Sequence, residues 1–443
     1  MNRTTPRFSL RLLPLLMALG CGFTASAQAQ SLVDLYNAAR GYDASFQSAR
    51  SQYDATLARA DQAQALLMPT VGLQSSLTRT TQEPEPLSER SFNTQTNTLI
   101  ASQPLYRPAN LANYKQGKKQ TEVAKSQMEA AEQDLIVRVS QAYFDVLAAS
   151  DNLTFVRSQK AAVGEQLASA KRNFEVGTST ITDSREAQAR YDLVIAQEIA
   201  ADNDLRVKSL ALTQLVGIST AAPKPMATPV ALGNPQGGDI EQWVRDAIAR
   251  NPLIQQQTIA LEVAQLETEK ARAGHKPTVD LNASYNAING GSYANTNDAR
   301  LNQTAIGVTL NLPLFAGNSV RNRVKETVAL EDKARTDLEA TTRSVTQGAR
   351  KAFLDLQAGA AQVKAFEAAE ISTQSALDAN KLGYQVGVRI NIDVLNSQSQ
   401  LYDTKAKLAK ARYDVLVGGL KLRQVAGTLK ADDLQPINSL LAK

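Results

Sequence analysis

Two related stretches decide the fold: NFEVGTSTITDSREAQARY at residues 173–191 and GYQVGVRINIDVLNSQSQL at residues 383–401. Each contains an aromatic residue, then x-V-G, and then β-branched and polar residues that lead to an aspartate. The copies differ notably where Ser179 of the first corresponds to Arg389 of the second. A motif that recurs at a fixed separation indicates one structural unit present twice. The Ser/Arg difference indicates that the two units have diverged.

The repeat covers most of the chain. With an offset of 208 and no gap, residues 32–73 align with 240–281, so that MPTVGL lies on KPTVDL. Farther along, QPLY ending at Tyr106 matches LPLF ending at Phe315. A segment rich in Pro, Gly and Ala separates the copies and is typical of a linker. We therefore expect a signal peptide, a first structural repeat, a linker, a second structural repeat and a C-terminal tail, at 1–29, 30–218, 219–238, 239–428 and 429–443.

The first 29 residues are typical of a secretory signal peptide. Arg3, Arg7 and Arg11 form a basic start, an apolar stretch follows, and ASAQAQ offers small-residue cleavage sites. Removing three arginines and no acids lowers the formal charge from +5 to about +2, which argues against a nucleic-acid partner. Because no later run of about 18 apolar residues follows, the protein is expected to be exported without a transmembrane helix.

The sequence offers little material for catalysis. Cys21, the only cysteine, lies in the signal peptide as either a lipid-acceptor residue or an ordinary apolar-region residue, so the exported chain has no thiol. His275, the only histidine, lies in the turn-like GHKPTVD without a second His or Cys to complete a metal or acid–base site. Phosphate-binding, nucleophile-elbow and zinc-spacing motifs are absent from the sequence. We predict a non-enzyme with no cofactor and no dedicated metal site.

Two proline-free spans, 109–222 and 314–435, predict long helices. Apolar and small residues recur in each at 7-4-3-4-7 spacing, the a/d seam of a left-handed coiled coil. The seam positions are Met128, Leu135, Val139, Ala142, Val146 and Leu153, and then Leu338, Val345, Ala349, Ala352, Leu356 and Val363. From Asn110 to Lys171 such a helix would be roughly 90 Å long. A rod of this length spans a compartment or reaches a partner.

The segments between the helices predict strands. Residues 279–285 and 306–312 alternate apolar side chains with small or polar ones, a period of two that suits a wall between lipid and water. The first repeat has the same order less cleanly, with Val71, Leu73 and Leu77 followed by Leu99 and Ala101. Polar loops are expected at 81–90 and 286–302. Each repeat therefore contributes one hairpin.

Four strands from one chain do not close a barrel. Open strand edges are not tolerated in hydrocarbon, because each unpaired amide would cost several kcal/mol. The chain must therefore complete the wall with copies of itself, and three copies would supply about twelve strands around a lumen. The strand pattern alone leaves three and four copies open.

These features resemble a known family. The doubled unit, the PTV and PLF strand motifs, AIARNP from 247 and GYQVGVRINIDVLNSQSQLYDTKAKLAKARYDVL from 383 closely resemble the TolC family of outer-membrane channel-tunnel proteins, over about residues 31–430. The resemblance implies a mainly α fold with membrane β structure, in which a trimeric 12-stranded β-barrel continues into a long α-helical coiled-coil barrel. It also implies a place in the outer membrane of a Gram-negative bacterium, extending into the periplasm.

By the same resemblance, the protein is a passive exit duct of a tripartite export system, for proteins in type I secretion or for small drugs and toxins. The homotrimer would dock with a periplasmic adaptor protein and an inner-membrane ABC or RND transporter, and would contact outer-membrane lipid. The cargo and the pump are not identified by the sequence. A soluble periplasmic coiled-coil adaptor is an alternative, but it has no use for the alternating hairpins. A porin or adhesin would not need two long proline-free spans.

The resemblance assigns a periplasmic gate to the repeated motif. Thr182 and Asp183 of the first repeat would face Tyr384 and Arg389 of the second, within and between protomers. A lock between unlike surfaces needs a donor on one and an acceptor on the other, which accounts for the Ser/Arg divergence. Each partly wet link is expected to stabilise closure by only about 0.5–1.5 kcal/mol, so that a partner can open the gate.

Three further positions complete the expected site. Asp393 would form a ring of carboxylates around the trimer axis, which favours cations and can bind a multivalent one. The family often has a second acid one turn farther on, where this chain has Asn396, and this weakens the expectation of strong cation block. Gly177 and Gly387 are expected to end one helix and turn into the next at the tunnel tip, where an adaptor would touch.

Overall fold

The structure is a computed structural model that describes residues 29–83, 89–219, 221–227, 239–291 and 299–442. The predicted signal peptide with Cys21, most of the predicted linker and the tips of both predicted polar loops lie outside these residues.

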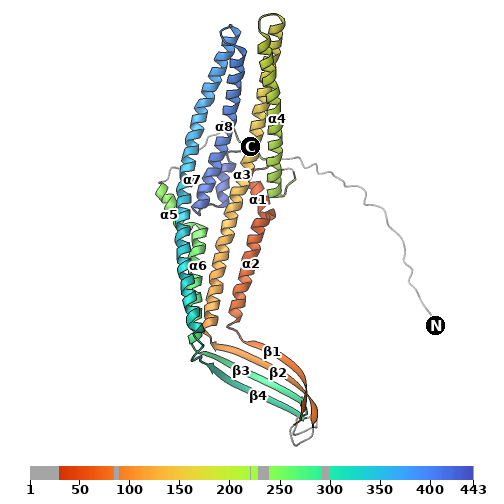
Figure 1. The fold of residues 1–443 in the computed structure, drawn as a ribbon, viewed down its shortest axis with the longest axis vertical. Helices are drawn as coiled ribbons and strands as arrows, with labels where there is room; N and C mark the ends of the chain where they lie inside the picture. The colour runs from red at the N-terminus through yellow and green to blue at the C-terminus, as the bar shows by residue number, and fades with distance from the viewer. Residues whose placement is uncertain (1–28, 84–88, 220, 228–238, 292–298, 443) are drawn as a thin grey trace, which may run out of the picture.

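The molecule is elongated, with a small sheet at one end and long helices over the rest of its length (Figure 1). The first half of the chain comprises α1 (Leu32–Tyr42), α2 (Ala44–Ala65), β1 (Thr70–Gln82), β2 (Arg90–Tyr106), α3 (Pro108–Glu175) and α4 (Ile181–Val216). The second half comprises α5 (Ile240–Arg250), α6 (Pro252–Arg272), η1 (Ala273–His275), β3 (Thr278–Gly290), β4 (Ala299–Asn311), α7 (Ser319–Gln385) and α8 (Asn391–Val425), followed by η2 (Ala431–Asp433) and α9 (Leu434–Asn438). Apart from the short η1 and the terminal η2 and α9, the two halves have the same order of elements, as the repeat predicts.

Local chemistry explains where the helices begin and end. Asp43 and Asn251, which the offset of 208 places on each other, are the N-caps of α2 and α6, and each side chain accepts a hydrogen bond from a backbone N–H of the first turn. Proline opens α3 at Pro108, where its missing N–H costs nothing. The helix α3 then runs for 68 residues and α7 for 67, which confirms the proline-free rods.

The predicted seam lies largely inside the helix bundle. Leu135, Val139, Val146 and Leu153 are buried in the first repeat, as are Val345, Ala349 and Val363 in the second. The most extensive core lies at mid-length, where α1, α3, α4, α8 and α9 meet (Figure 1). Aromatic rings fill its centre: Tyr143 contacts Phe144 edge to face, and Phe144 stacks on Tyr413 at 5.5 Å between ring centroids. This core holds α3 near its middle together with the ends of α4 and α8 that lie away from the tips.

The four strands form one antiparallel sheet in the order β1-β2-β3-β4. The hairpins β1–β2 and β3–β4 come from the two repeats, and β2 pairs with β3 to join them. The predicted loop at 286–302 was too long, because β3 continues to Gly290 and β4 already begins at Ala299. The loop predicted at 81–90 overlaps strands only at its ends, where β1 ends at Gln82 and β2 begins at Arg90. Polar side chains do not prevent this pairing, since the backbone of 286–290 is satisfied across the hairpin by 299–303.

One face of the sheet is apolar and exposed. Val71, Leu73, Leu77, Ile306, Val308 and Leu310 share this face and are each more than 60% exposed. The opposite face carries mainly Ser, Thr, Asn and Gln, with hydrogen bonds such as Ser102 Oγ to Asn282 Oδ1 at 2.8 Å and Asn282 Nδ2 to Thr309 Oγ1 at 3.0 Å. The strands β1 and β4 are the edges, and neither has a second partner strand within the described chain. No described helix is both long enough and apolar enough to cross a membrane.

Candidate functional site

The two helix tips farthest from the sheet carry the repeated motif (Figure 1). At each tip a long helix reverses into a shorter one through a left-handed glycine, with φ of +80° at Gly177 and +77° at Gly387. The turns close in the same way: the N–H of Thr178 bonds to the carbonyl of Asn173, and the N–H of Val388 bonds to the carbonyl of Gly383. Both glycines therefore adopt the turn conformation that the sequence predicted.

The first tip is closed by a dense local network. Thr180 caps α4 and forms a reciprocal capping box with Asp183. The Oδ2 atom of Asp183 accepts hydrogen bonds from Ser179 Oγ at 2.6 Å, Thr180 Oγ1 at 2.9 Å and the Thr180 N–H at 3.1 Å. The bond from Ser179, joined by those from Thr180, lowers the pKa of Asp183 below its ordinary value despite partial burial. Asp183 is therefore a carboxylate near neutral pH.

The second tip lacks this network. Ile390 occupies the N-cap position of α8 and has no side chain that could bond to the backbone. Arg389, which replaces Ser179, instead lies 3.7 Å from Asp393 between Nη1 and Oδ2, and both side chains are partly exposed. The divergence between the repeats therefore exchanges a self-capped turn for one that presents a cation and a carboxylate.

Within one chain the structure does not bring the four predicted gate residues together. Thr182 contacts Thr180 through their hydroxyl groups at 3.0 Å, and the hydroxyl oxygen of Tyr384 accepts a hydrogen bond from Asn173 Nδ2 at 3.4 Å. No hydrogen bond or ion pair joins Arg389 to Asp183 in the described part of the chain. The Oδ1 atom of Asp183 likewise has no hydrogen-bond partner there, so this acceptor is available to a neighbouring protomer.

A residue that the sequence reasoning missed joins the two helix pairs. Asn391 is fully buried; its Oδ1 accepts a short hydrogen bond from Gln166 of α3, and its Nδ2 donates to the backbone carbonyl of Asp183 at 3.3 Å. The offset of 210 places Asn391 on Ile181, which is 49% exposed. One sequence signal could have identified Asn391: the second repeat has an amide where the first repeat has an apolar residue.

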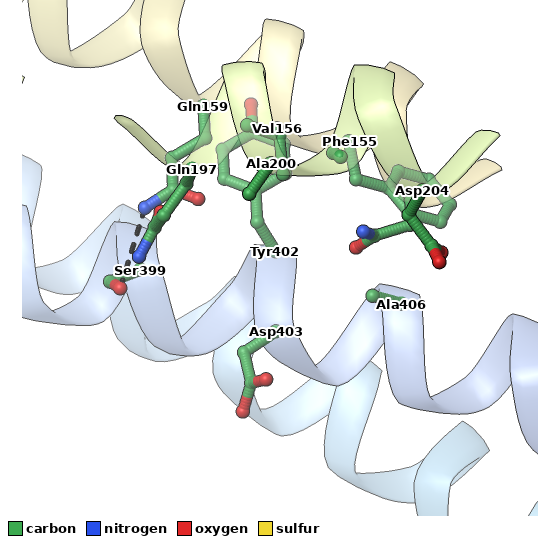
Figure 2. A pocket seen from close by; sticks show the side chains of 12 residues that line it. Phe155, Val156, Gln159, Gln197, Ala200, Asp204, Ser399, Tyr402, Asp403 and Ala406 are labelled. Carbon is green, nitrogen blue, oxygen red and sulfur yellow. Dashed lines mark hydrogen bonds between the residues drawn. The ribbon is translucent and has the colours of Figure 1, made fainter. Parts of the chain in front are cut away.

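A cavity of about 490 Å³ lies between α3, α4 and α8 (Figure 2). Tyr402 of α8 and Phe155 of α3 line it, and a single weak hydrogen bond, from Gln159 Nε2 to Ser399 Oγ at 3.4 Å, crosses between the helix pairs there. Burial, and secondarily the charge of Glu165, raises the pKa of Tyr402, so its phenol stays neutral. The helix pairs are therefore loosely packed against each other in this region.

Between this cavity and the tips, Arg190 donates to Asn396 Oδ1 at 2.7 Å. Asn396 is the position at which an acid was expected by resemblance, and here it serves as an acceptor for the neighbouring helix pair. Asp393 lies one turn away and is paired with Arg389. The described residues contain no group of three potential metal ligands, so an axial carboxylate site would need Asp393 from several chains.

Exposed apolar side chains lie at both tips, more of them at the second, whereas the first tip also exposes Thr178 and Thr180. Val176 is 72% exposed, and Val386, Val388 and Ile390 are 65%, 79% and 60% exposed. These side chains surround the two glycine turns and contribute little to the described cores. Exposed apolar groups at the end of a rod mark a surface suited to a protein partner.

Comparisons with known proteins agree with this architecture. A sequence model of the family described as outer membrane efflux protein matches residues 35–218 and 243–428. The outer membrane protein TolC of Vibrio cholerae is 34% identical over 434 residues, which cover 97% of this chain and 98% of that protein. The alkaline protease secretion protein AprF of Pseudomonas aeruginosa is 31% identical over 422 residues, which cover 92% of this chain and 87% of that protein. The solved structure of the outer membrane protein VceC of Vibrio cholerae shares the fold, with a TM-score of 0.78 at 19% identity over 89% of this chain and 96% of that chain.

Proposed function

This chain belongs to the outer membrane efflux protein family, and from that membership we propose that three copies of it form a channel-tunnel that carries cargo out through the outer membrane. The four-stranded sheet is one third of a barrel wall, and the helices continue the wall into the periplasm. The role is transport and not catalysis.

The observation that carries this proposal is the sheet with two unlike faces and two open edges. Its apolar face suits lipid, and its polar face suits a wet lumen. The edges β1 and β4 leave backbone N–H and C=O groups unpaired, which hydrocarbon does not tolerate. Pairing β4 of one protomer with β1 of the next removes every edge and closes the wall. A soluble periplasmic adaptor has no need of such a sheet, and the relatives support the duct rather than that alternative.

The helix tips form the gate of this tunnel. In the closed trimer, Arg389 of one protomer donates to the unpartnered Oδ1 of Asp183 on its neighbour, and Tyr384 adds a hydroxyl near Thr182. Bidentate geometry is not available, because Oδ2 already accepts three hydrogen bonds. Each link is therefore worth only about 0.5–1.5 kcal/mol, and a partner at the tips can break the set. Asp393 from three chains lines the axis and favours cations.

The helix tips around Gly177 and Gly387, with their exposed valines, are the surface for a periplasmic adaptor, which connects the tunnel to an ABC or RND transporter in the inner membrane. Polypeptide cargo is favoured over small drugs. The relatives that are at least 30% identical and nearly full-length include two named for protease secretion, AprF and PrtF, whereas the toluene efflux pump outer membrane protein TtgC is 22% identical over 66% of this chain.

The test is conduction by the purified protein. Wild-type protein inserted into planar lipid bilayers should form ion-conducting trimers of low conductance, and Arg389→Ser should raise the single-channel conductance because it removes the inter-protomer donor. A monomer that fails to conduct contradicts the channel. If the trimers conduct and R389S leaves the conductance unchanged, the channel proposal stands but Arg389 is not part of the gate.

A further inference from the structure

The sheet carries an ion pair where β2 and β3 meet the helices. Arg107 follows β2 and forms a bidentate pair with Asp280 of β3, with Nε to Oδ1 at 2.7 Å and Nη2 to Oδ2 at 2.7 Å. The carboxylate is 12% exposed and the guanidinium 44% exposed. This geometry lets the two charges cancel closely while the arginine still borders water.

A β-bulge brings the two residues to the same face. The register of β2 against β3 shifts between Pro104 and Tyr106: Pro104 opposes Asp280, and Tyr106 opposes Val279. The extra residue keeps Tyr106 on the apolar face and turns Arg107 to the polar face, where Asp280 lies. Without the bulge the alternation would place Tyr106 on the polar face and Arg107 among apolar side chains.

The rest of the polar face is uncharged where all four strands pair; the next charge on this face, Arg90, lies beyond that region, opposite Gln82. In the described region where all four strands are paired, Asp280 is its only charged side chain. Its neighbours on that face are hydroxyl and amide groups, among them Thr96, Thr98, Ser102, Asn282, Ser284, Asn286, Gln303 and Thr309. A lumen with this lining interacts weakly with cargo of either sign.

The pair occurs in only one of two equivalent places. The repeat aligns Asp280 with Gly72 and Arg107 with Ala316, so the corresponding contact between β4 and β1 of neighbouring protomers would carry no charge. A structural clamp would be equally useful at both junctions. The chain instead introduces one carboxylate and one guanidinium together.

We propose that Arg107 and Asp280 are a charge-cancelling pair that keeps the barrel lumen electrically neutral, so that the barrel itself does not discriminate between anionic and cationic cargo. This inference rests on the channel proposed above, and on the polar face of the sheet lining its lumen. Ion selectivity then arises at the helix tips, and the barrel admits polypeptide segments of either charge. Removing one member of the pair leaves a threefold ring of like charges, the arrangement that sets selectivity in pores.

The experiment measures the zero-current potential of single channels in a salt gradient. Asp280→Asn should shift it towards anions, and Arg107→Gln should shift it towards cations. The double variant R107Q/D280N should return to the wild-type value. Asn282→Asp, which places an unpaired carboxylate two residues along on the same face, should reproduce the sign of the R107Q shift and calibrates its size.

The outcomes separate the two proposals. Wild-type protein that does not conduct contradicts the channel itself. Wild-type conduction with unchanged potentials in D280N and R107Q overturns only the charge-cancelling pair, whatever N282D does. Should the single variants fail to assemble, the double variant and N282D decide together. A wild-type potential in R107Q/D280N with a shifted one in N282D supports the pair, because the face then senses charge and removing two cancelling charges leaves the lumen neutral. A shifted potential in the double variant, or an unchanged one in N282D, overturns it.

Discussion

Asn391 shows how much one side chain contributes where large helix surfaces meet loosely. Near the tips, the hairpin of α7 and α8 meets the hairpin of α3 and α4 through Leu395, which packs among apolar residues of α3 and α4, and through a few polar contacts. Among the described residues, Asn391 alone hydrogen-bonds to both α3 and α4. An amide buried this deeply is costly unless its hydrogen bonds are made. Its geometry therefore specifies one register between the two helix pairs.

Asn391→Ala should loosen the closed tip. The change leaves Gln166 Nε2 and the Asp183 carbonyl without their partner, a cost of about 1–3 kcal/mol. We expect a higher single-channel conductance in planar bilayers. The matched control is Asn380→Ala, which removes a hydrogen bond to Ser397 within the α7–α8 hairpin and leaves the contact with α3 and α4 intact. Equal conductance in the two variants would mean that Asn391 does not hold the tip closed.

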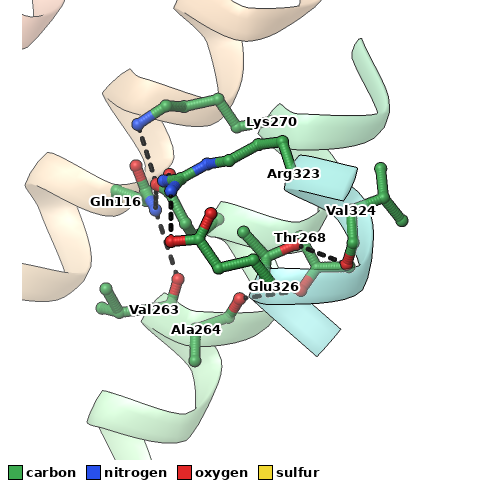
Figure 3. Close-up of polar contacts among 10 residues, drawn as sticks. Gln116, Val263, Ala264, Thr268, Lys270, Arg323, Val324 and Glu326 are labelled. Carbon is green, nitrogen blue, oxygen red and sulfur yellow. Dashed lines mark hydrogen bonds and ion pairs between the residues drawn. The ribbon is translucent and has the colours of Figure 1, made fainter. Parts of the chain in front are cut away.

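Glu267 organises a second polar cluster, on the other side of the core, where α3, α6 and α7 run side by side. Its carboxylate accepts hydrogen bonds from Lys270 at 2.7 Å, Gln116 at 2.9 Å and Arg323 at 2.7 Å, and Figure 3 shows these donors converging. Burial alone would raise the pKa of Glu267, but these hydrogen bonds outweigh it and hold the pKa at about 2. The cluster ties both repeats together at the end of the helices that is near the sheet.

The stability that Glu267 contributes should depend on pH. Because its folded pKa lies below the ordinary value of 4.5, the contribution is complete above about pH 4.5 and is lost as the pH falls from there towards 2. Solvent screening reduces it to about 1 kcal/mol. Glu267→Gln should therefore unfold at a lower temperature than wild type at pH 7. At pH 3 the difference between the two unfolding temperatures should be smaller. Glu326→Gln, which removes only an exposed pair with Arg323, serves as the control and should show neither effect.

At the scale of elements, the two repeats share backbone and differ in side chains. The turns after α3 and α7 both use a left-handed glycine, and the helices α4 and α8 both end before one, at Gly217 and Gly427. The capping box of Thr180 has no counterpart at Ile390. Duplication has preserved the positions where only the backbone conformation matters, whereas positions that meet a different neighbour have changed.

Two glycine variants separate conformational strain from steric exclusion. Gly177→Ala adds a methyl group that meets nothing within 4 Å, so its cost is the left-handed conformation alone, about 1–2 kcal/mol. Gly427→Ala has a similar φ but would place Cβ only 2.3 Å from the Arg250 carbonyl oxygen, which adds about 1–3 kcal/mol. Thermal unfolding followed by far-UV circular dichroism should therefore show a larger loss for G427A. Equal losses would mean that α5 yields to the added group.

At the scale of the whole molecule, the chain is an incomplete wall attached to a long rod. Its mid-length core is well filled, but its sheet exposes a continuous apolar face and two open edges. Such a surface is stable only in lipid and next to further strands. Membrane insertion and self-assembly therefore complete the fold.

Two adjacent residues of β4, at the same depth of the sheet, test which face of the sheet meets lipid. Ile306 lies on the apolar face opposite Ala283, and Ala305 lies on the polar face opposite Ser284. Ile306→Arg should cost about 2–4 kcal/mol in the membrane and reduce the yield of heat-dissociable trimers in the outer-membrane fraction. Ala305→Arg should preserve that yield and change only conductance. A reversed result would assign the lumen to the other face.

The sequence by itself determined the doubled unit, the proline-free rods, the glycine turns and the four strands with their two faces. These follow from local rules, since periodicity, caps and proline act within a few residues. Strand lengths were underestimated at 286–302, because backbone pairing tolerates polar side chains that loop composition suggested.

Only the tertiary structure decided which side chains meet. The burial of Asn391 against α3 and α4 depends on the rotation of helices relative to segments more than two hundred residues away. The pairing of Arg107 with Asp280 depends on the register of β2 against β3 and on one bulge. Periodicity assigns a residue to a face, but a hydrogen bond requires its partner within about 3 Å. That precision arises from packing, which no local pattern encodes.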